Sequence, residues 1–340
     1  MKRKNKILII GNQGYVGSVL VKFLKKKNTS VYGLDSGIFS KILIDKNPDK
    51  LLSKQLRIDI KKINTSLLNK FETIIYLAAI SNDPMGNKFH NLTLETNYNL
   101  CLKIAKMAKK QGVRKFIFAS SCSVYGSVGK KSRKENDKLD PKTIYAKTKI
   151  WSEKKLKNIS SKNFKVFCLR FATACGYSPR IRLDLVLNDF ITSAIVNKNI
   201  TLLSDGKAWR PLISVDNMSR IISYFTFKSL ISLEKNFYII NCGTNSWNFR
   251  IISLAKKVSS LIKKTPVIIG NANENDKRSY KVNFNYLKKL APDLKLDENI
   301  DKLILQMYNK IKKVKIDRNF RQSKFIRLVI LEKYLKKYGN

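Results

Sequence analysis

A glycine-rich turn near the N-terminus constrains the fold of this chain more than any other feature. The apolar run Lys6–Ile10 indicates a buried strand, which continues directly into GNQGYVG (11–17) and then a helix over 19–27. In this spacing the first glycine allows a tight turn, the second lets a pyrophosphate approach the backbone, and the third lets helix and strand pack closely. The helix N-terminus contributes free N–H groups and the positive end of its dipole. The segment therefore predicts a dinucleotide site.

The residue that ends the second predicted strand bears on the choice of dinucleotide. That strand covers 30–34 and is followed by Asp35. A carboxylate at this point accepts hydrogen bonds from both hydroxyls of an adenosine ribose and repels a 2′-phosphate, which favours NAD over NADP. Spaced glycines alone are a weak signal, so an ordinary turn followed by a surface aspartate is the alternative.

The first half of the chain alternates short apolar runs with amphipathic stretches, the pattern of a doubly wound parallel sheet. After about residue 170 the order loosens, with a helix near 185–197 and short strands near 201–203 and 212–215. The further strands and the helices expected in the sheet region lie near 56–60, 73–79, 115–119 and 165–169, and over 92–111 and 143–159.

These elements predict an α/β fold: a Rossmann-type doubly wound parallel sheet with a smaller C-terminal α/β substrate lobe. The length of 340 residues allows two such domains. We expect residues 1–175 to hold the cofactor and the catalytic residues, and 176–315 to form the lobe, with 212–245 returning to the core. Residues 316–340 are expected to form a basic C-terminal helix.

The net charge of +44 raises the question of a polyanionic partner. Of the 68 basic residues 54 are Lys and only 14 are Arg, and they are spread along a chain that is also rich in Ile and Asn. An AT-rich coding sequence produces this skew, whereas specific nucleic-acid sites rely on Arg for bidentate contacts. We therefore attribute the charge mainly to composition, and expect no nucleic-acid and no membrane partner. Steering of an anionic small substrate and binding of a polyanion are the alternatives.

The histidine and cysteine counts exclude several kinds of site. With His90 as the only histidine, an HExxH or paired-histidine zinc site is impossible, and Ser–His–Asp hydrolysis would depend on that one residue. The five cysteines never reach CxxC spacing, which suits a reducing compartment. The apolar run after the basic residues 1–5 stops at Gly11, too early for a signal peptide or a membrane span. We expect no metal and a cytoplasmic protein.

Ser121, Tyr145 and Lys149 form the predicted catalytic set. Tyr145 and Lys149 lie four residues apart and so share one face of a predicted helix. A cation there, with a bound and positively charged nicotinamide, is expected to lower the pKa of the phenol, so that Tyr145 acts as a general base near neutral pH. Ser121 follows a predicted strand and could hold the reacting oxygen against the phenol. Tyr and Lys meet at this spacing by chance in a Lys-rich chain, so the prediction depends on their order after the glycine turn and Asp35.

In these ordered motifs the chain resembles the extended short-chain dehydrogenase/reductases, the nucleotide-sugar epimerase and dehydratase family. The resemblance covers about residues 6–310 and rests on GNQGYVG (11–17), Asp59-Ile60, LAA (77–79), Asn97, SSCSVYG (120–126), YAKTK (145–149) and LRFATACG (169–176). It implies NAD as the cofactor, with Asp59-Ile60 at the adenine, 77–79 lining the cofactor and Asn97 supporting the active site. The cofactor-binding residues are then Gly11, Gln13, Gly14, Tyr15, Val16, Gly17, Asp35, Asp59, Ile60, Leu77, Ala78, Ala79, Asn97, Tyr145 and Lys149.

The resemblance also implies a nucleotide-sugar substrate, with the nucleotide held by the C-terminal lobe, and a homodimer formed through the helices over 92–111 and 143–159. The positions that match the family's nucleotide-binding residues are Asn188, Arg210 and Arg278. The residue after Arg210 is Pro211, where many relatives carry Asp. The stretches SNDPMG (81–86) and SPRIRLD (178–184) follow strands, and we expect them near the sugar or its diphosphate, with Arg180 and Arg182 pairing phosphate oxygens. Ordinary rim loops are the alternative for both. The predicted substrate-binding residues are Asn82, Ser123, Thr173, Arg182, Asn188, Arg210 and Arg278.

The residues after Ser121 favour simple hydride chemistry. Where the family's 4,6-dehydratases carry Thr-Asp-Glu, this chain has Ser121-Cys122-Ser123, with no carboxylate to serve as acid or base. The 3,5-epimerase/4-reductases use a Cys and a His, but Ser123 matches that Cys and the only His lies elsewhere; Cys122 is expected to pack rather than react. We expect an NAD-dependent epimerase that works through a transient 4-keto sugar. The alternatives are an NAD(P)-dependent reductase or dehydrogenase of a nucleotide-linked 4-keto sugar and, more remotely, a non-enzymatic protein that binds RNA or membrane.

Overall fold

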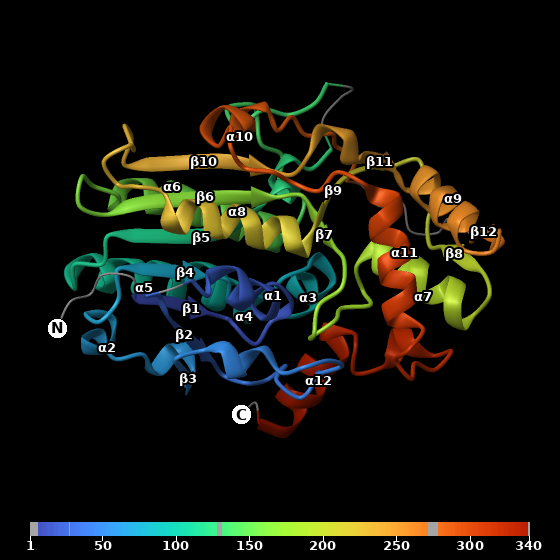
Figure 1. Ribbon diagram of the computed structural model, residues 1–340, viewed down its shortest axis with the longest axis horizontal. Helices are drawn as coiled ribbons and strands as arrows, with labels where there is room; N and C mark the ends of the chain where they lie inside the picture. The colour runs from blue at the N-terminus through green and yellow to red at the C-terminus, as the bar shows by residue number, and fades with distance from the viewer. Residues whose placement is uncertain (1–5, 27, 128–130, 271–277, 339–340) are drawn as a thin grey trace.

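The main sheet of this computed structural model has seven parallel strands in the order β10-β6-β5-β4-β1-β2-β3 (Figure 1). The structure describes residues 6–26, 28–127, 131–270 and 278–338. The chain builds the sheet outward from β1 to β3, returns to the centre, and continues through β4, β5 and β6 to β10. This reversal between β1 and β4 is the switch point of a doubly wound sheet. The strands are β1 (Lys6–Ile10), β2 (Ser30–Asp35), β3 (Lys54–Arg57), β4 (Thr73–Tyr76), β5 (Lys115–Ser121), β6 (Lys165–Phe171) and β10 (Phe237–Cys242).

Alternate strand residues contribute to two cores, one on each face of the sheet. In β1, Ile7 and Ile9 pack with α1 and α8, whereas Leu8 and Ile10 pack in the core that contains α5. A parallel strand covered on both faces consists of a continuous apolar run, which explains the composition of β1. Figure 1 shows α1 and α8 on the near face and α5 and α6 behind the sheet. These helices are α1 (Tyr15–Leu24), α8 (Val215–Phe227), α5 (Leu100–Lys110) and α6 (Ile144–Ile159).

A smaller lobe lies beyond the carboxyl ends of the strands (Figure 1). It holds two short sheets, β11-β9-β7 and β12-β8, and three helices whose side chains form a third core. After β9 the chain returns to the main sheet, where α8 packs on α1 and β10 pairs with β6. The lobe elements are β7 (Thr173–Cys175), α7 (Val186–Val196), β8 (Ile200–Leu202), β9 (Trp209–Ser214), β11 (Asn248–Arg250), α9 (Ile251–Leu261), β12 (Val267–Ile269) and α11 (Ile300–Ile311). The predicted fold class is confirmed.

The single helix predicted over 92–111 is divided in the structure. It begins as α4 (His90–Leu94), passes through a π-helical turn, Glu95–Asn99, and continues as α5. The wider turn contains Asn97, whose side chain is hydrogen-bonded to the backbone of Ile80 rather than lying on a regular helix face. Interruptions of this kind occur frequently at functional sites.

The basic C-terminal helix predicted for 316–340 is shorter than expected. The segment first forms a short 3-10 turn, Phe320–Gln322, and then α12 (Arg327–Tyr338), which packs against α3 (Asp83–Lys88). Lys88 and Glu332 form an ion pair between these two helices. Within the described part of the chain, no helix is both long and apolar enough to cross a membrane.

Candidate active site

The glycine turn leaves the start of α1 open to an anionic ligand. Gly11 has a φ of +92°, and a Cβ on it would lie 2.6 Å from the backbone nitrogen of Ala78, so only glycine fits there. A Cβ on Gly14 would meet only the carbonyl oxygen of Gly11, at 3.2 Å. No side chain caps the N-terminus of α1, and its first turn carries no acidic residue. The N–H groups of Tyr15, Val16 and Gly17, in the first turn of α1, therefore have no capping side chain. Phosphate binding at a helix N-terminus uses such free N–H groups.

Asp35 lies beside this turn at the end of β2. Its two oxygens accept hydrogen bonds from the backbone N–H groups of Gln13 (3.0 Å) and Gly37 (2.9 Å). Burial raises the pKa of the Asp35 carboxyl, while these two bonds and the nearby Arg180 oppose the rise. Carboxylate oxygens accept more than one hydrogen bond, so both retain capacity for ribose hydroxyls. The side chain of Gln13 donates to Asp49 (2.7 Å), which leaves its buried Oε1 without a donor among the described residues.

The side chain of Tyr15, one of the predicted cofactor-binding residues, contacts the lobe. Its buried hydroxyl donates to the carbonyl of Gly176 at 2.7 Å and is 3.4 Å from the amide nitrogen of Asn188. The side chain therefore ties α1 to the lobe, and only the backbone of Tyr15 is available to a cofactor. Val16 is half-buried within the same helical turn.

The other cofactor positions are near the strand ends. Asp59 is exposed, and its carboxylate caps the short helix Ile60–Lys62 by accepting the N–H of Lys61 (2.9 Å). The half-buried Leu77 and Ala78 donate their N–H groups to Ile10 (2.8 and 3.0 Å), and Ala79 follows them. Residues 77–79 are thereby held against the glycine turn.

Asn97 fixes the segment that follows β4. Its amide oxygen accepts the N–H of Ile80 at 2.9 Å, and its amide nitrogen donates to the Ile80 carbonyl at 3.0 Å. Ser152, on α6, donates to the Asn97 carbonyl at 3.0 Å. Asn97 thus connects the end of β4 to the helix that carries Tyr145, which is the supporting role that the family resemblance implies.

The structure brings Ser121, Tyr145 and Lys149 together at the carboxyl edge of the sheet. Ser121 is the last residue of β5, and its hydroxyl is close enough to the Tyr145 phenol, in the first turn of α6, to influence the pKa of that phenol. Lys149 lies one turn further along α6, with its Nζ 5.5 Å from the centre of the Tyr145 ring. The Lys149 ammonium donates to the Ala119 carbonyl at 2.7 Å and lies 4.6 Å from the Phe118 ring.

The lowered pKa was predicted for the phenol with nicotinamide bound; in the chain without a cofactor the pKa of Tyr145 is raised. Burial raises the pKa of Tyr145 to about 12, and Asp83 adds to the rise, while the Ser121 hydrogen bond and Arg182 oppose it. Lys149 is directed at the Ala119 carbonyl, and burial lowers its own pKa to about 8. Tyr145 therefore holds its proton at neutral pH unless further positive charge is brought to it.

A buried ion pair beneath Lys149 was not predicted from the sequence. Glu153, one turn after Lys149 on α6, accepts from Nε and Nη2 of Arg170 at 2.9 and 2.7 Å. It also accepts the hydroxyl of Ser120 at 2.6 Å, and Arg170 donates to the Tyr125 hydroxyl at 2.9 Å. The spacing of Lys149 and Glu153 was the available signal, but Arg170 lies on a different strand.

Asp83 is a second site residue that the sequence did not single out. It lies in the first turn of α3, where it accepts the hydroxyl of Thr143 and forms an ion pair with Arg278. Thr143 is the N-cap of α6, directly before the turn that holds Tyr145. Arg210 donates to the carbonyl of Arg278, so the structure brings both predicted arginines to the catalytic side of the lobe.

The loops 81–86 and 178–184 meet, as expected, but their arginines are already paired. Arg182 forms a bidentate bond with Asp184 (3.0 and 2.7 Å) and donates to Ser81 at 3.0 Å. Asn82 donates to the same carboxylate at 2.8 Å. Arg180 is held by Asp49 at 2.7 Å.

Three further substrate predictions have different outcomes. Asn188 is buried; its amide accepts the N–H of Gly176 (2.9 Å) and donates to the carbonyl of Arg182 (2.8 Å), so it holds the loop instead of presenting a free amide to a nucleotide. Ser123 is buried next to Ser121, and its hydroxyl has no partner among the described residues. Thr173 is half-buried at the start of β7.

The cysteines are part of the packing. All five are buried and unpaired, and burial raises the pKa of the Cys122 thiol, which donates to the Arg170 carbonyl. A thiol with a raised pKa carries little reactive thiolate, in agreement with the packing role expected for Cys122. Among the described residues, no three His, Cys, Asp or Glu side chains gather closely enough to hold a metal.

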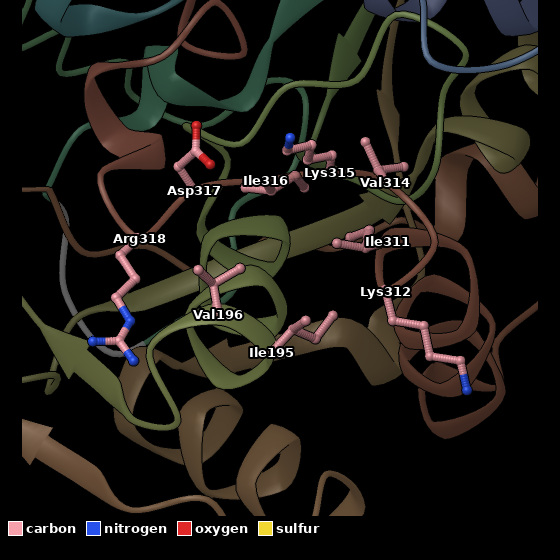
Figure 2. Close-up of a pocket in the computed structure, with 9 residues that line it drawn as sticks. All are labelled: Ile195, Val196, Ile311, Lys312, Val314, Lys315, Ile316, Asp317 and Arg318. Atoms are coloured by element: carbon pink, nitrogen blue, oxygen red, sulfur yellow. The ribbon is translucent and has the colours of Figure 1, made fainter.

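A surface cavity of about 460 Å³ lies on the lobe, remote from these residues. Its lining comes from the end of α7, the end of α11 and the segment that follows, and Figure 2 shows an apolar floor with basic side chains around it. None of the residues predicted for cofactor, catalysis or substrate lines it. Its lining residues are Ile195, Val196, Ile311, Lys312, Val314, Lys315, Ile316, Asp317 and Arg318.

A Rossmann-type sheet with an open glycine turn and a Ser/Tyr/Lys set at its carboxyl edge is the arrangement of the extended short-chain dehydrogenase/reductases. The chain belongs to the NAD dependent epimerase/dehydratase family, whose sequence profile matches residues 7–232. YtcB of Bacillus subtilis strain 168, described as an uncharacterized UDP-glucose epimerase, is 34% identical over 221 residues, which are 60% of this chain and 67% of YtcB. Protein CapI of Staphylococcus aureus is 30% identical over 230 residues, 64% of this chain and 68% of CapI.

Solved structures share the whole fold. MoeE5 in complex with UDP-glucose and NAD superposes with a TM-score of 0.77 at 20% identity, covering 91% of this chain and 99% of MoeE5. The family match ends at residue 232, whereas this likeness in fold extends over most of the lobe as well.

Proposed function

We propose that the protein is an NAD-dependent epimerase that inverts one carbon of a sugar carried by a nucleoside diphosphate, through a transient 4-keto sugar. The observation that carries the proposal is the grouping of Ser121 and Lys149 around the Tyr145 phenol, at the same edge of the sheet as the glycine turn and with no carboxylate at 122–123. The name of YtcB and the ligands of MoeE5 support the same classes of substrate and cofactor.

The residues around the glycine turn fit a dinucleotide. Gly14 and the uncapped start of α1 suit its diphosphate, and the Asp35 carboxylate suits the adenosine ribose and disfavours a 2′-phosphate. Arg180, the cation near Asp35, is paired with Asp49 and so does not favour NADP. When bound, NAD takes up and returns the hydride, and its nicotinamide adds positive charge near the phenol.

Tyr145 moves the proton in this mechanism. In the oxidative half, its Oη accepts the proton of the sugar hydroxyl while hydride leaves the carbon that bears that hydroxyl; in the reductive half, it returns the proton to the same oxygen. The Ser121 hydroxyl lies near the phenol and can hold the reacting oxygen in place. Lys149, fixed by the Ala119 carbonyl, keeps an ammonium close to the ring that ionises.

The grip on the substrate diphosphate is proposed to come from Arg210 and Arg278. Arg210 donates to the backbone of Arg278, so one arginine orients the other. Arg278 forms an ion pair with Asp83, and the Asp83 carboxylate is close enough to the Tyr145 phenol to raise its pKa. A diphosphate held by Arg278 would place the attached sugar within reach of Tyr145, because Asp83 interacts with both Arg278 and the phenol.

The test is the variant Tyr145→Phe assayed on a panel of UDP-sugars by NMR, which reports inversion at C4 without net NADH. We expect turnover to fall roughly 10²–10⁴-fold, the usual contribution of a general acid–base group. The matched control is Tyr338→Phe, a loss of the same hydroxyl at an exposed position, which should leave turnover unchanged. Near-normal turnover by Tyr145→Phe would overturn the assignment.

A one-way reductase or dehydrogenase of a nucleotide-linked 4-keto sugar is the second candidate. One observation favours it: a phenol whose pKa is raised to about 12 is a proton donor at neutral pH, as reduction of a ketone requires. Stoichiometric consumption of NADH or NADPH for each product formed would select this candidate over the epimerase.

We further propose a homodimer formed through α5 and α6, with the cofactor domain at 1–175 and the lobe at 176–315. Trp151 on α6 remains 39% exposed and stacks edge-on with Tyr98, which provides an aromatic patch on that helix pair. The five unpaired cysteines suit a reducing compartment, for which we propose the cytoplasm.

A further inference from the structure

The segment that leads into α12 is firmly anchored beside the candidate active site. Arg321 forms a bidentate bond with Asp189 of α7 (2.9 and 2.8 Å), and Phe320 and Phe325 are buried in the core of the lobe. Leu331 of α12 packs with Ile80, directly after the cofactor-lining residues 77–79. Figure 1 shows α12 on the side of the molecule where the strands of the main sheet end. The position of Arg327, the first residue of α12, is therefore fixed from both sides.

Arg327 is almost completely buried, with 2% of its surface exposed, and only part of its guanidinium is hydrogen-bonded. Its Nη2 donates to the Arg180 carbonyl at 2.8 Å, and the guanidinium lies 4.8 Å from the centre of the Phe39 ring. In the described parts of the chain, its Nη1 has no hydrogen-bond acceptor and no carboxylate pairs with it. A buried cation in this condition is costly to the fold, so it points to an anion from outside the chain.

The surroundings of Arg327 belong to the dinucleotide end of the site. The loop that it contacts passes over the start of α1, where Ser178 donates to the Tyr15 carbonyl (2.8 Å) and Arg180 donates to Ser18 (2.9 Å). Phe39 follows shortly after Asp35, the predicted ribose acceptor. The neighbouring arginines Arg180 and Arg182 each have a carboxylate of their own, whereas Arg327 does not.

The other buried atoms without a partner lie in segments that hold predicted cofactor or catalytic residues. Three buried side-chain N or O atoms in the described chain lack a hydrogen-bond partner: Oε1 of Gln13, Oγ of Ser123 and Nη1 of Arg327. Gln13 lies in the glycine turn and Ser123 follows the catalytic Ser121. Burial of Arg327, with Arg182 and Arg180 nearby, lowers the pKa of its guanidinium, while Asp184 and Asp35 oppose the fall.

We propose that Arg327 is a cofactor-binding residue: its Nη1 donates to the diphosphate of the bound dinucleotide, so that α12 closes the dinucleotide site from the C-terminal end of the chain. This inference rests on the proposed binding of NAD. The shared ligand chemistry is a diphosphate, and the neighbouring Asp35, Phe39 and α1 select the diphosphate of the cofactor over that of the sugar nucleotide. The residue lies outside 7–232, the part of the chain that matches the family.

The test compares Arg327→Met, which keeps an apolar stem, with Lys333→Met, which removes one cation from an exposed position of the same helix. Calorimetric titration of the full chain, freed of any co-purified dinucleotide, uses NAD⁺, ADP-ribose, adenosine and UDP. Charge-assisted hydrogen bonds of this kind predict that Arg327→Met weakens NAD⁺ and ADP-ribose binding roughly 10–100-fold. Adenosine and UDP binding should change little, and Lys333→Met should match the wild type for all four.

Unchanged NAD⁺ binding by Arg327→Met would overturn the inference while leaving the proposed function intact, whereas a wild-type chain that binds neither NAD⁺ nor ADP-ribose would defeat the proposed function itself. Weakened UDP binding with unchanged NAD⁺ binding would assign Arg327 to the substrate diphosphate instead. If Arg327→Met does not fold, hydrogen–deuterium exchange on the wild-type chain decides. NAD⁺ should slow exchange several-fold in 327–338, and equal exchange with and without NAD⁺ would contradict the closure by α12.

Discussion

Arg170 and Glu153 form a bidentate ion pair, at 2.9 and 2.7 Å, in the interior directly beneath Lys149. Both side chains are almost fully buried, and the carboxylate also accepts the Ser120 hydroxyl, one residue before Ser121. The pair therefore connects β6, β5 and α6, the last two of which carry the catalytic side chains. It contacts none of the atoms proposed to react, so it is a positioning pair.

Removing one member of this pair should destabilise the whole fold. We expect Glu153→Gln to lower the free energy of unfolding by roughly 3 kcal/mol, because Arg170 is left buried without its counter-charge. Urea denaturation measures the change. The matched control is Asp301→Asn, which breaks the half-buried, solvent-accessible Lys257–Asp301 pair and should cost less than about 1 kcal/mol. Equal losses of unfolding free energy at the two positions would show that the buried pair stabilises the fold no more than the accessible one.

Lys149 should make stability depend on pH in the alkaline range. Burial lowers its pKa to about 8 from the ordinary 10.5, so between these values the unfolded chain binds more protons than the folded chain. Stability conferred by this group therefore rises with pH from about 8 towards 10.5, with a slope approaching 1.4 kcal/mol per pH unit.

The measurement is the difference in unfolding free energy between the wild type and Lys149→Met from pH 7.5 to 9.5. The difference removes contributions from other groups, such as Lys115, whose pKa burial also lowers. The wild type should gain on the variant as the pH rises. A difference that stays constant would mean that Lys149 titrates near its ordinary pKa.

Tyr15→Phe separates a structural role from a cofactor role. The hydroxyl bonds the Gly176 carbonyl, so its loss should cost about 1 kcal/mol of stability. NAD⁺ affinity should stay within about twofold of the wild type, because only the backbone of this residue faces the turn. Thermal unfolding and calorimetry give the two quantities. A large loss of NAD⁺ affinity with unchanged stability would show that the side chain itself binds the cofactor.

Asp35→Ala tests the choice of dinucleotide. Loss of a carboxylate that accepts ribose hydroxyls should weaken NAD⁺ binding roughly 10-fold or more, while NADP⁺ binding weakens less or improves because repulsion of the 2′-phosphate is lost. Asp45→Ala, on the exposed loop after β2, serves as the control. An unchanged ratio of the NAD⁺ and NADP⁺ affinities would show that Asp35 does not select between the two dinucleotides.

The sequence predicted the sheet and the glycine turn well because both are local. The run Lys6–Ile10 is β1 to the residue, and the spacing of Gly11, Gly14 and Gly17 places α1 directly after it. The π-helical turn at Asn97 was not predictable, since it depends on bonds to Ile80 on another element.

The residues of the candidate site could be predicted from the sequence, but their pKa shifts and ion pairs could not. The pattern identified Ser121, Tyr145 and Lys149, yet the direction of the Tyr145 pKa depends on burial and on Asp83, which approaches only in three dimensions. In the same way, Arg180 pairs with Asp49, 131 positions earlier in the chain. Long-range pairing of this kind leaves no periodic trace in the sequence.

The proposed epimerase retains NAD and recycles it during turnover. The most direct measurement is to purify the protein, denature it, and identify and count the dinucleotide released. We expect NAD at close to one molecule per chain. A protein that releases none, and that takes up NADPH more tightly than NADH, would contradict both the role of Asp35 and the epimerase.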